Sequence, residues 1–288
     1  MGKRSLGIAA ILVSAIYFGF IPLFVKVAYA NGATTMTAAF FRFAGTLPFL
    51  WVYLRARGID IKVSLSELRR IALISVFGYC GTAALLFTSY KYISSGVATT
   101  VHFLYPAVTV FAAIFIYKKK MSSVKLICMA LCIIGIVMFH DGGIGKSLLG
   151  IILSAASALT YGFYTIYLGN NDIGEMNSLK LLFHMSWIGT LMMLALGAVT
   201  GDLDFSYNPV SWGVMITVSV LTTFIGAFGY QTGVRYVGSE NAAMLSTFEP
   251  ITSIVVGVMV YDEAFTVRTA VGCAAIIIST LLIARSKE

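Results

Sequence analysis

The sequence predicts an all-α polytopic membrane protein with ten transmembrane helices, arranged as two inverted repeats of five. Three observations predict this fold class: an apolar composition, a series of apolar segments long enough to cross a bilayer, and an internal repeat about half as long as the chain. Of the 288 residues, 59% are hydrophobic and 11% are charged. A soluble domain carries about 25% charged residues to solvate its surface. The composition therefore excludes a soluble globular protein.

The candidate spans follow from the length of the apolar segments. A helix that crosses the hydrocarbon needs about 20 mostly apolar residues, because in lipid the backbone must satisfy its own hydrogen bonds. The segments that fit are 7–28, 35–54, 70–90, 94–117, 124–139, 147–168, 178–200, 210–232, 240–260 and 267–284. Pro22, Pro106 and Pro250 lie within spans and predict kinks.

The start of the chain resembles a signal peptide, because an apolar stretch follows Lys3 and Arg4. A signal peptide has an apolar region of about 7–15 residues, and this stretch is longer. We therefore expect it to be retained as the first helix.

The basic residues predict the orientation of the chain. With the N-terminus inside, 15 of the 20 Lys and Arg residues lie on the cytoplasmic side, four lie outside, and Arg42 lies within a span. Because cytoplasmic loops carry the excess of Lys and Arg, this bias predicts both termini in the cytoplasm, on a protein of the cell membrane. The net charge of +8 then reflects orientation, and no nucleic-acid partner is expected.

An internal repeat relates the two halves of the chain. The stretch 92–106 (YISSGVATTVHFLYP) matches 236–250 (YVGSENAAMLSTFEP) at a shift of 144 residues, and 18–20 (FGF) resembles 161–163 (YGF) at a shift of 143. Each half has five predicted helices, and an odd number requires the second half to enter the membrane upside down. Inverted repeats let a carrier alternate access between two faces.

We therefore expect two five-helix units, residues 1–140 and 147–284, that form a secondary carrier. A membrane-embedded enzyme acting on lipid or prenyl substrates is an alternative, but such chemistry usually needs clustered carboxylates or metal ligands, and the chain has no HExxH spacing. A channel is another alternative, although it needs no alternating access. The four cysteines lack the partners that a zinc site requires, so neither a metal nor another cofactor is expected.

Several motifs match a known family pattern. Phe248-Glu249-Pro250 is followed by Asp262-Glu263 and by Gly272 in the last span, and Phe41-Arg42-Phe43 lies in the second span. Over its whole length the chain resembles EamA-type proteins of the drug/metabolite transporter superfamily, whose pattern has Glu-Pro in the ninth helix and Gly-Glu fourteen residues later. Here Asp262 replaces that glycine. The resemblance implies a secondary carrier of small organic metabolites, often an exporter of amino acids.

Glu249 is the only carboxylate near the middle of a predicted span. An ionisable residue at that depth costs about 2.5–3.5 kcal/mol on insertion scales, so it tends to face a cavity or a partner. Polar residues share its helix face at three- and four-residue steps, and the first repeat has polar residues at the equivalent positions. These candidate substrate-binding or coupling residues are Ser246, Glu249, Ser253, His102, Tyr105 and Thr109.

Each of these assignments has a structural alternative. Glu249 would either bind an ammonium group or exchange a proton. Alternatively, its protonated carboxyl would donate to the carbonyl that Pro250 leaves without a donor. His102 would take part in transport, or it would be a hydrogen-bonded histidine within a packed bundle.

Arg42, Phe18 and Tyr161 complete the candidate site. Arg42 could bind a substrate carboxylate with its planar guanidinium, or pair within the protein. Phe18 and Tyr161 occupy equivalent positions in the repeats and could bind an amine by cation–π contact, or simply pack against neighbours. The expected solute is an amino acid or another amine-bearing metabolite, with export as the expected direction. Uptake of a quaternary ammonium or organic cation is the alternative. Membrane lipid, a proton or other coupling ion, and a second copy in a homodimer are the candidate partners.

Overall fold

The computed structural model describes residues 2–93, 95–116, 118, 122–139, 148–261 and 266–285. Every regular element in these ranges is helical. In chain order they are α1 (Lys3–Gly19), α2 (Ile21–Ala30), α3 (Thr35–Ala44), α4 (Leu47–Ala56), α5 (Leu65–Ile74), the π-helical turn η1 (Ser75–Cys80), α6 (Gly81–Ser89), α7 (Ser95–His102), α8 (Tyr105–Phe115), α9 (Ser123–Phe139), α10 (Leu148–Asn170), the 3-10 turn η2 (Asp172–Glu175), α11 (Ser178–Thr200), α12 (Pro209–Leu221), the π-helical turn η3 (Thr222–Ala227), α13 (Phe228–Val237), α14 (Ser239–Leu245), α15 (Phe248–Tyr261) and α16 (Val267–Arg285).

Seven helical stretches of the described chain are long and apolar enough to cross a membrane. They are Lys3–Ala30, Thr35–Ala56, Leu65–Ser89, Leu148–Asn170, Ser178–Thr200, Pro209–Val237 and Ser239–Val260. The three other predicted spans coincide with α7 and α8, with α9 and with α16. These three contain or adjoin residues outside the described ranges, so the total of ten remains a prediction. The Asp262-Glu263 motif also lies outside those ranges.

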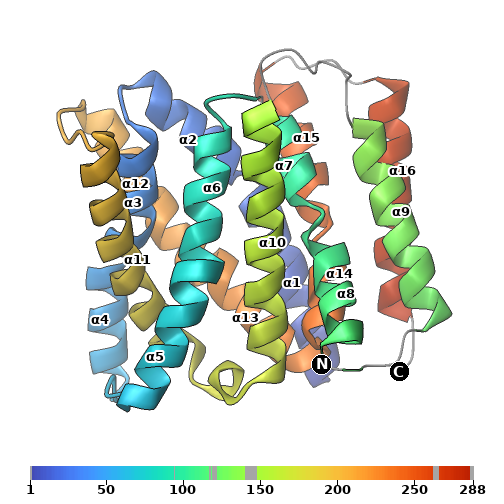
Figure 1. Cartoon of the computed structure of the whole chain (residues 1–288), viewed down its shortest axis with the longest axis horizontal. Helices are drawn as coiled ribbons and strands as arrows, with labels where there is room; N and C mark the ends of the chain where they lie inside the picture. The colour runs from blue at the N-terminus through green and yellow to red at the C-terminus, as the bar shows by residue number, and fades with distance from the viewer. Residues whose placement is uncertain are drawn as a thin grey trace.

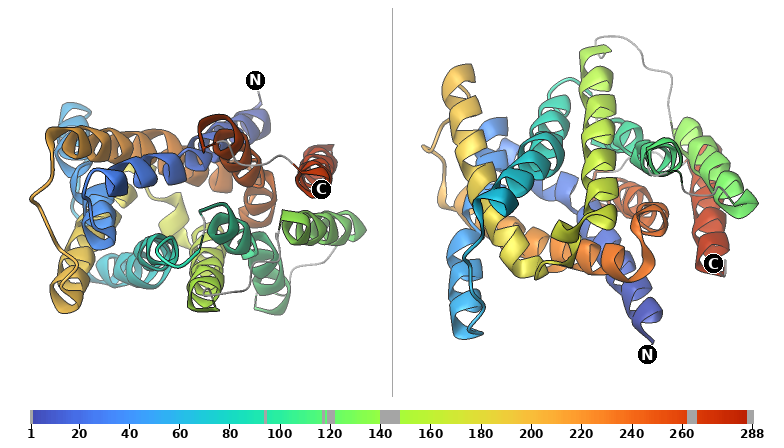
Figure 2. Two further views of the ribbon diagram at one scale, coloured as in Figure 1. Left: turned by 90° about the horizontal axis from the view of Figure 1, so that it is seen from above. Right: turned by 60° about the horizontal axis from the view of Figure 1, so that its bottom comes forward.

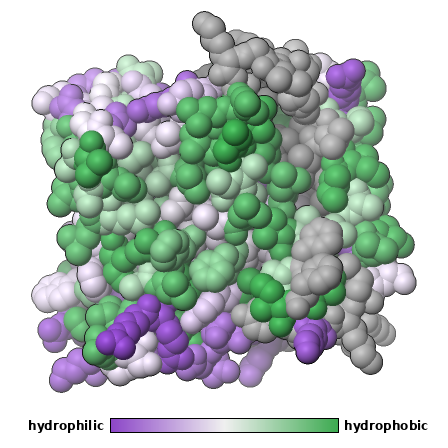
Figure 3. Space-filling model, viewed as in Figure 1, coloured by the Kyte–Doolittle hydropathy of each residue, from purple (hydrophilic) through white to green (hydrophobic). Residues whose placement is uncertain are grey.

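The elements stand side by side as an upright bundle, in which α1 begins and α16 ends at the same end (Figures 1 and 2). Apolar residues cover the middle of the face shown in Figure 3, and hydrophilic residues gather toward its two ends. Large apolar side chains such as Val13, Val52 and Leu159 are 55%, 59% and 60% exposed. In water this exposure would be unfavourable, whereas in a bilayer these side chains face lipid. The chain is a multi-pass membrane protein.

Proline residues divide several of the spans into two half-helices. The backbone leaves α-helical geometry just before Pro22, Pro48, Pro106 and Pro250, at the junctions α1–α2, α3–α4, α7–α8 and α14–α15. Proline has no N–H to continue the ladder, but it is tolerated in the first turn of a new helix. At Pro22, Pro106 and Pro250, where the sequence predicted kinks, the helices are interrupted. The continuous polar face predicted through Ser246 is interrupted, because Ser246 lies in the break and Glu249 lies in the first turn of α15.

Glycine contacts recur in the two halves with the shift seen in the sequence. A Cβ atom on Gly19 would lie 2.8 Å from the Glu249 carbonyl oxygen, and one on Gly162 would lie 3.4 Å from that of Tyr105. Glu249 follows Tyr105 by 144 residues, and Gly162 follows Gly19 by 143. The first span of each half therefore packs on the fourth span of the other half in one register, as a two-repeat architecture requires. The π-helical turns η1 and η3 likewise fall within the third span of each half.

Candidate functional site

A small cavity lies between elements of both halves, beside the breaks at Pro22 and Pro250. Its volume is about 30 Å³, which is room for one or two water molecules. A metabolite is much larger, so the cavity does not accommodate one in this conformation. The cavity is lined by Phe18, Ile21, Pro22, Arg42, Thr82, Leu86, Phe87, Tyr90, His102, Tyr161 and Glu249.

Five of the nine predicted site residues line this cavity: Glu249, His102, Arg42, Phe18 and Tyr161. They come from α15, α7, α3, α1 and α10 and are distant in sequence. Both repeats therefore contribute to one site, as expected for a carrier whose binding site lies at the repeat interface.

The other four predicted residues do not line this cavity. The Tyr105 ring centroid is 5.4 Å from that of His102 and 4.7 Å from that of Tyr161, so it supports two lining residues. The remaining three hydroxyls donate to backbone carbonyls: Thr109 to Tyr105 (2.9 Å), Ser246 to Ala242 (3.0 Å) and Ser253 to Gly19 (3.0 Å). The Thr109 and Ser246 bonds lie within one helical turn, whereas the Ser253 bond joins α15 to the end of α1.

The Glu249 carboxyl makes no hydrogen bond or ion pair with the described residues of the chain. The carbonyl that Pro250 leaves without its usual donor belongs to Ser246. That oxygen accepts from the Glu249 backbone N–H at 2.9 Å. A main-chain donor thus satisfies this carbonyl, so the Glu249 carboxyl is not needed as its hydrogen-bond donor. The carboxyl group is left facing the cavity.

Arg42 is held by aromatic rings rather than by a carboxylate. Its guanidinium carbon lies 5.5 Å from the ring centroid of Tyr79, 5.6 Å from that of Phe87 and 5.8 Å from that of Phe43. These distances suit cation–π contact. Its Nε is buried without a hydrogen-bond acceptor among the described residues. No ion pair joins Arg42 to Glu249 within that part of the chain, so one cavity contains a cation and a carboxyl group that are not paired with each other.

His102 has an assignable tautomer. The Ser157 hydroxyl donates to the Ser154 carbonyl at 2.6 Å, so it accepts from Nδ1 of His102 at 2.8 Å. This assignment follows from the hydrogen-bond network. It leaves Nε2 for the cavity that His102 lines. The ring also lies 5.5 Å from that of Tyr161, which lies 5.5 Å from both Tyr164 and Tyr230, so an aromatic cluster supports this wall.

Sequence reasoning missed the wall that the third span contributes. Thr82, Leu86, Phe87 and Tyr90 all line the cavity. Thr82, Leu86 and Tyr90 recur at four-residue steps, which places them on one helix face. The spacing alone does not say whether this face meets lipid or the cavity. The π-helical turn η1 just before it, a feature that is frequent at functional sites, is seen only in the structure.

A metal centre is not indicated by the side chains present. No group of three or more His, Cys, Asp or Glu residues in the described ranges is placed to hold a metal ion. The chemistry available in the cavity is therefore that of a guanidinium, a carboxyl, an imidazole and aromatic rings.

Comparisons with known proteins agree with this architecture. A model of the EamA-like transporter family matches residues 5–140 and again residues 148–285. An uncharacterized transporter of Archaeoglobus fulgidus is 24% identical over 278 residues, which cover 96% of this chain and 95% of the relative. The uncharacterized transporter YcbK of Bacillus subtilis is 23% identical over 287 residues, with 95% and 91% covered. A solved crystal structure superposes with a TM-score of 0.75 at 17% identity, covering 98% of this chain and 96% of the other, which shows a likeness of fold.

Proposed function

The chain belongs to the EamA-like transporter family, and on that basis we propose that it is a secondary carrier of an amino acid or a related amine-bearing solute. It is a membrane transporter rather than an enzyme. The proposal concerns the solute, the direction of its movement and what drives it.

The observation that carries the proposal is the mutually unpaired Arg42 and Glu249 in one cavity. A guanidinium binds a carboxylate through two parallel hydrogen bonds, and a carboxylate binds an ammonium group. A zwitterion supplies both partners. A dianion would leave Glu249 unmatched, and a simple organic cation would leave Arg42 without an anion. Phe18 and Tyr161 add aromatic faces on which an ammonium group can rest.

The repeats support a carrier mechanism. Residues 1–140 and 147–284 act as two inverted units that exchange conformations and so expose the cavity to one face at a time. We propose that both termini are cytoplasmic, that the protein lies in the cell membrane, and that the solute is exported. Glu249 exchanges a proton during the cycle and thereby couples export to a proton gradient. A homodimer remains a prediction of the sequence.

Counterflow in proteoliposomes tests the solute class. Proteoliposomes that contain the purified protein and are preloaded with an unlabelled amino-acid mixture are expected to accumulate labelled amino acids from outside. The matched amines without the carboxylate, and the matched acids without the amine, should exchange weakly. Robust exchange of dicarboxylates or phosphorylated sugars, without amino acids, would contradict the proposal. The organic-cation alternative, which the aromatic lining also suits, predicts another result. Quaternary ammonium compounds would then be exchanged, and the rate of this exchange would be the same in Arg42→Gln.

A further inference from the structure

Two turns at opposite ends of the bundle are each clamped between other helices. The first is the 31–36 turn between α2 and α3, and the second is the 172–176 turn between α10 and α11. Each connects the first and second spans of one half of the chain. The two lie at opposite ends in Figure 1.

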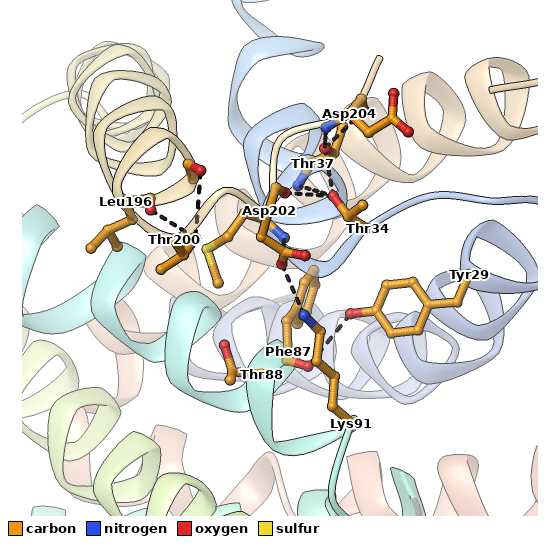
Figure 4. A network of polar contacts seen from close by, with 12 residues as sticks. Tyr29, Thr34, Thr37, Phe87, Thr88, Lys91, Leu196, Thr200, Asp202 and Asp204 are labelled. Carbon is orange, nitrogen blue, oxygen red and sulfur yellow. Dashed lines mark hydrogen bonds and ion pairs between the residues drawn. The ribbon is translucent and has the colours of Figure 1, made fainter. Parts of the chain in front are cut away.

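One side of the 31–36 turn is clamped through Asp202. The Lys91 ammonium lies 3.0 Å from the Asp202 carboxylate, which also accepts from the Met36 backbone N–H at 3.2 Å. The Thr34 hydroxyl donates to the Asp202 carbonyl at 2.6 Å. Figure 4 shows Asp202 between Lys91 and the start of α3. The end of the third span is thereby tied to this turn.

The other side of the same turn is tied to the start of the eighth predicted span. The Asn208 side-chain amide donates to the Asn31 side-chain oxygen at 3.0 Å, and the Ser211 hydroxyl donates to the Asn31 carbonyl at 3.0 Å. The turn is therefore held between two helices that come from different halves.

The 172–176 turn is clamped at the opposite end. The Arg235 guanidinium, at the end of the eighth predicted span, donates to the Gly174 carbonyl at 3.0 Å and also to the Met176 carbonyl. The Arg70 guanidinium, at the start of the third, donates to both Asp172 carboxylate oxygens at 2.5 and 2.8 Å.

The two clamps are related by the repeat. Arg235 follows Lys91 by 144 residues, which is the shift between the halves. Each turn is held between the end of the third span of its own half and the start of the third span of the other half. Such an arrangement, repeated at both ends, lets one clamp open while the other stays closed.

The clamp at the 31–36 turn adjoins the cavity along the chain. Lys91 follows Tyr90, which lines the cavity together with Leu86 on the same helix. Both clamps are formed in a structure whose cavity holds about 30 Å³. A solute that leaves the cavity toward either end of the bundle passes the end at which one of the two turns is clamped.

We propose that the two clamped turns are the gates of the transport pathway, with Lys91 and Arg235 as equivalent gate residues at opposite faces. This inference rests on the proposed carrier function but not on the identity of the solute. The gates differ in chemistry, because Lys91 depends on a carboxylate whereas Arg235 depends on backbone carbonyls. Neutralising Asp202 therefore weakens the Lys91 gate alone.

The test measures from which face the cavity is reached. Leu86→Cys, in a protein whose native cysteines are replaced, reports access to a membrane-impermeant maleimide added to either side of oriented vesicles. Asp202→Asn is expected to raise the labelling rate from the Lys91 face about two- to fivefold, as for the loss of one partly exposed ion pair, and to lower it from the opposite face. Arg235→Gln should produce the reverse pattern.

Asp204→Asn is the matched control, because Asp204 lies in the same loop and its carboxylate accepts from the Ser206 backbone N–H. It should leave labelling from both faces unchanged. The exchange of charges in Lys91→Asp with Asp202→Lys restores the ion pair but not the acceptor for the Met36 N–H, so the labelling rates should return part of the way to their original values. If Asp202→Asn does not fold, Lys91→Gln removes the same pair.

The gate assignment would be overturned if Asp202→Asn changed the labelling rate equally from both faces, or if Asp204→Asn changed it in the same way as Asp202→Asn. Labelling needs no solute, so a failure of the amino-acid proposal in counterflow leaves this result standing. Conversely, if counterflow is active but the labelling rates do not change in Asp202→Asn, the gate assignment is wrong and the proposed carrier function is unaffected.

Discussion

Gly19→Ala is expected to destabilise the protein and to impair transport, because α1 packs at Gly19 directly against α15. The new Cβ would lie 2.5 Å from the Thr252 Cβ and 2.8 Å from the Glu249 carbonyl oxygen. Ordinary van der Waals contact of such atoms begins near 3.4 Å. The two helices must therefore separate by several tenths of an ångström, at a site where one neighbour is backbone and cannot rotate away.

The magnitude follows from the cost of overpacking. An added methyl in a closely packed core costs about 1–3 kcal/mol, whereas Ala in place of Gly within a helix returns up to about 1 kcal/mol. A net loss of about 1–2 kcal/mol is expected in the free energy of unfolding. Because α15 carries Glu249 in its first turn, the same displacement shifts the carboxyl relative to Arg42 and is expected to lower the rate of counterflow.

Reversible unfolding in detergent, together with counterflow, measures both effects. Gly213→Ala is the control, since a Cβ on Gly213 meets nothing within 4 Å. It should be neutral or slightly stabilising. Gly162→Ala, at the equivalent position of the second half, should resemble Gly19→Ala, because its Cβ would lie 2.9 Å from the Val108 Cβ. If Gly19→Ala were as stable and as active as Gly213→Ala, the packing argument would be refuted.

Three further predictions concern charge. Glu249→Gln should insert and fold but transport poorly and lose any pH response; transport with an unchanged pH profile would leave the carboxyl a purely structural role. Arg42→Lys keeps the charge but not the planar fork, so counterflow should show a raised KM for amino acids and little change for amines without a carboxylate, whereas equal losses for both would point to misfolding. The Arg70 guanidinium lowers the pKa of Asp172 below its ordinary value of 3.8, so this pair stabilises the fold above that value and the contribution is lost as pH falls through the lower folded pKa. In Asp172→Asn the free energy of unfolding should therefore fall less steeply as the pH is lowered through this range. The same pH dependence as in the wild type would contradict this account.

The fold and the chemistry of the cavity could be read from the sequence because both depend on burial in lipid. Glu249 and Arg42 are informative since an ionisable side chain within an apolar segment must face something other than hydrocarbon. The repeat then predicted that His102 and Glu249 belong to one site, and both line the cavity.

The rest depends on contacts that the sequence does not encode locally. Leu86 and Tyr90 look like any other residues of an apolar helix, and only packing decides whether they face lipid or the cavity. Asp202 lies in a loop 111 residues from Lys91, and no local pattern predicts that partner. Ser246 was placed on the face of Glu249 by helical periodicity, which the break before Pro250 interrupts.

The proline breaks are not shared equally by the two halves. Pro22 and Pro48 interrupt the first and second spans of the first half, whereas α10 and α11 run without interruption in the second. In a perfectly symmetric inverted repeat the two end states would have equal energy. Here two broken spans of the first half have unbroken counterparts in the second, so the two states should differ in energy and the two directions of reorientation should cross barriers of different height. Microscopic reversibility still forbids this asymmetry from altering the final solute gradient. Its signature is an unequal apparent KM at the two faces, which comparison of initial rates in right-side-out and inside-out vesicles measures directly; equal values would show that the extra breaks leave the cycle symmetric.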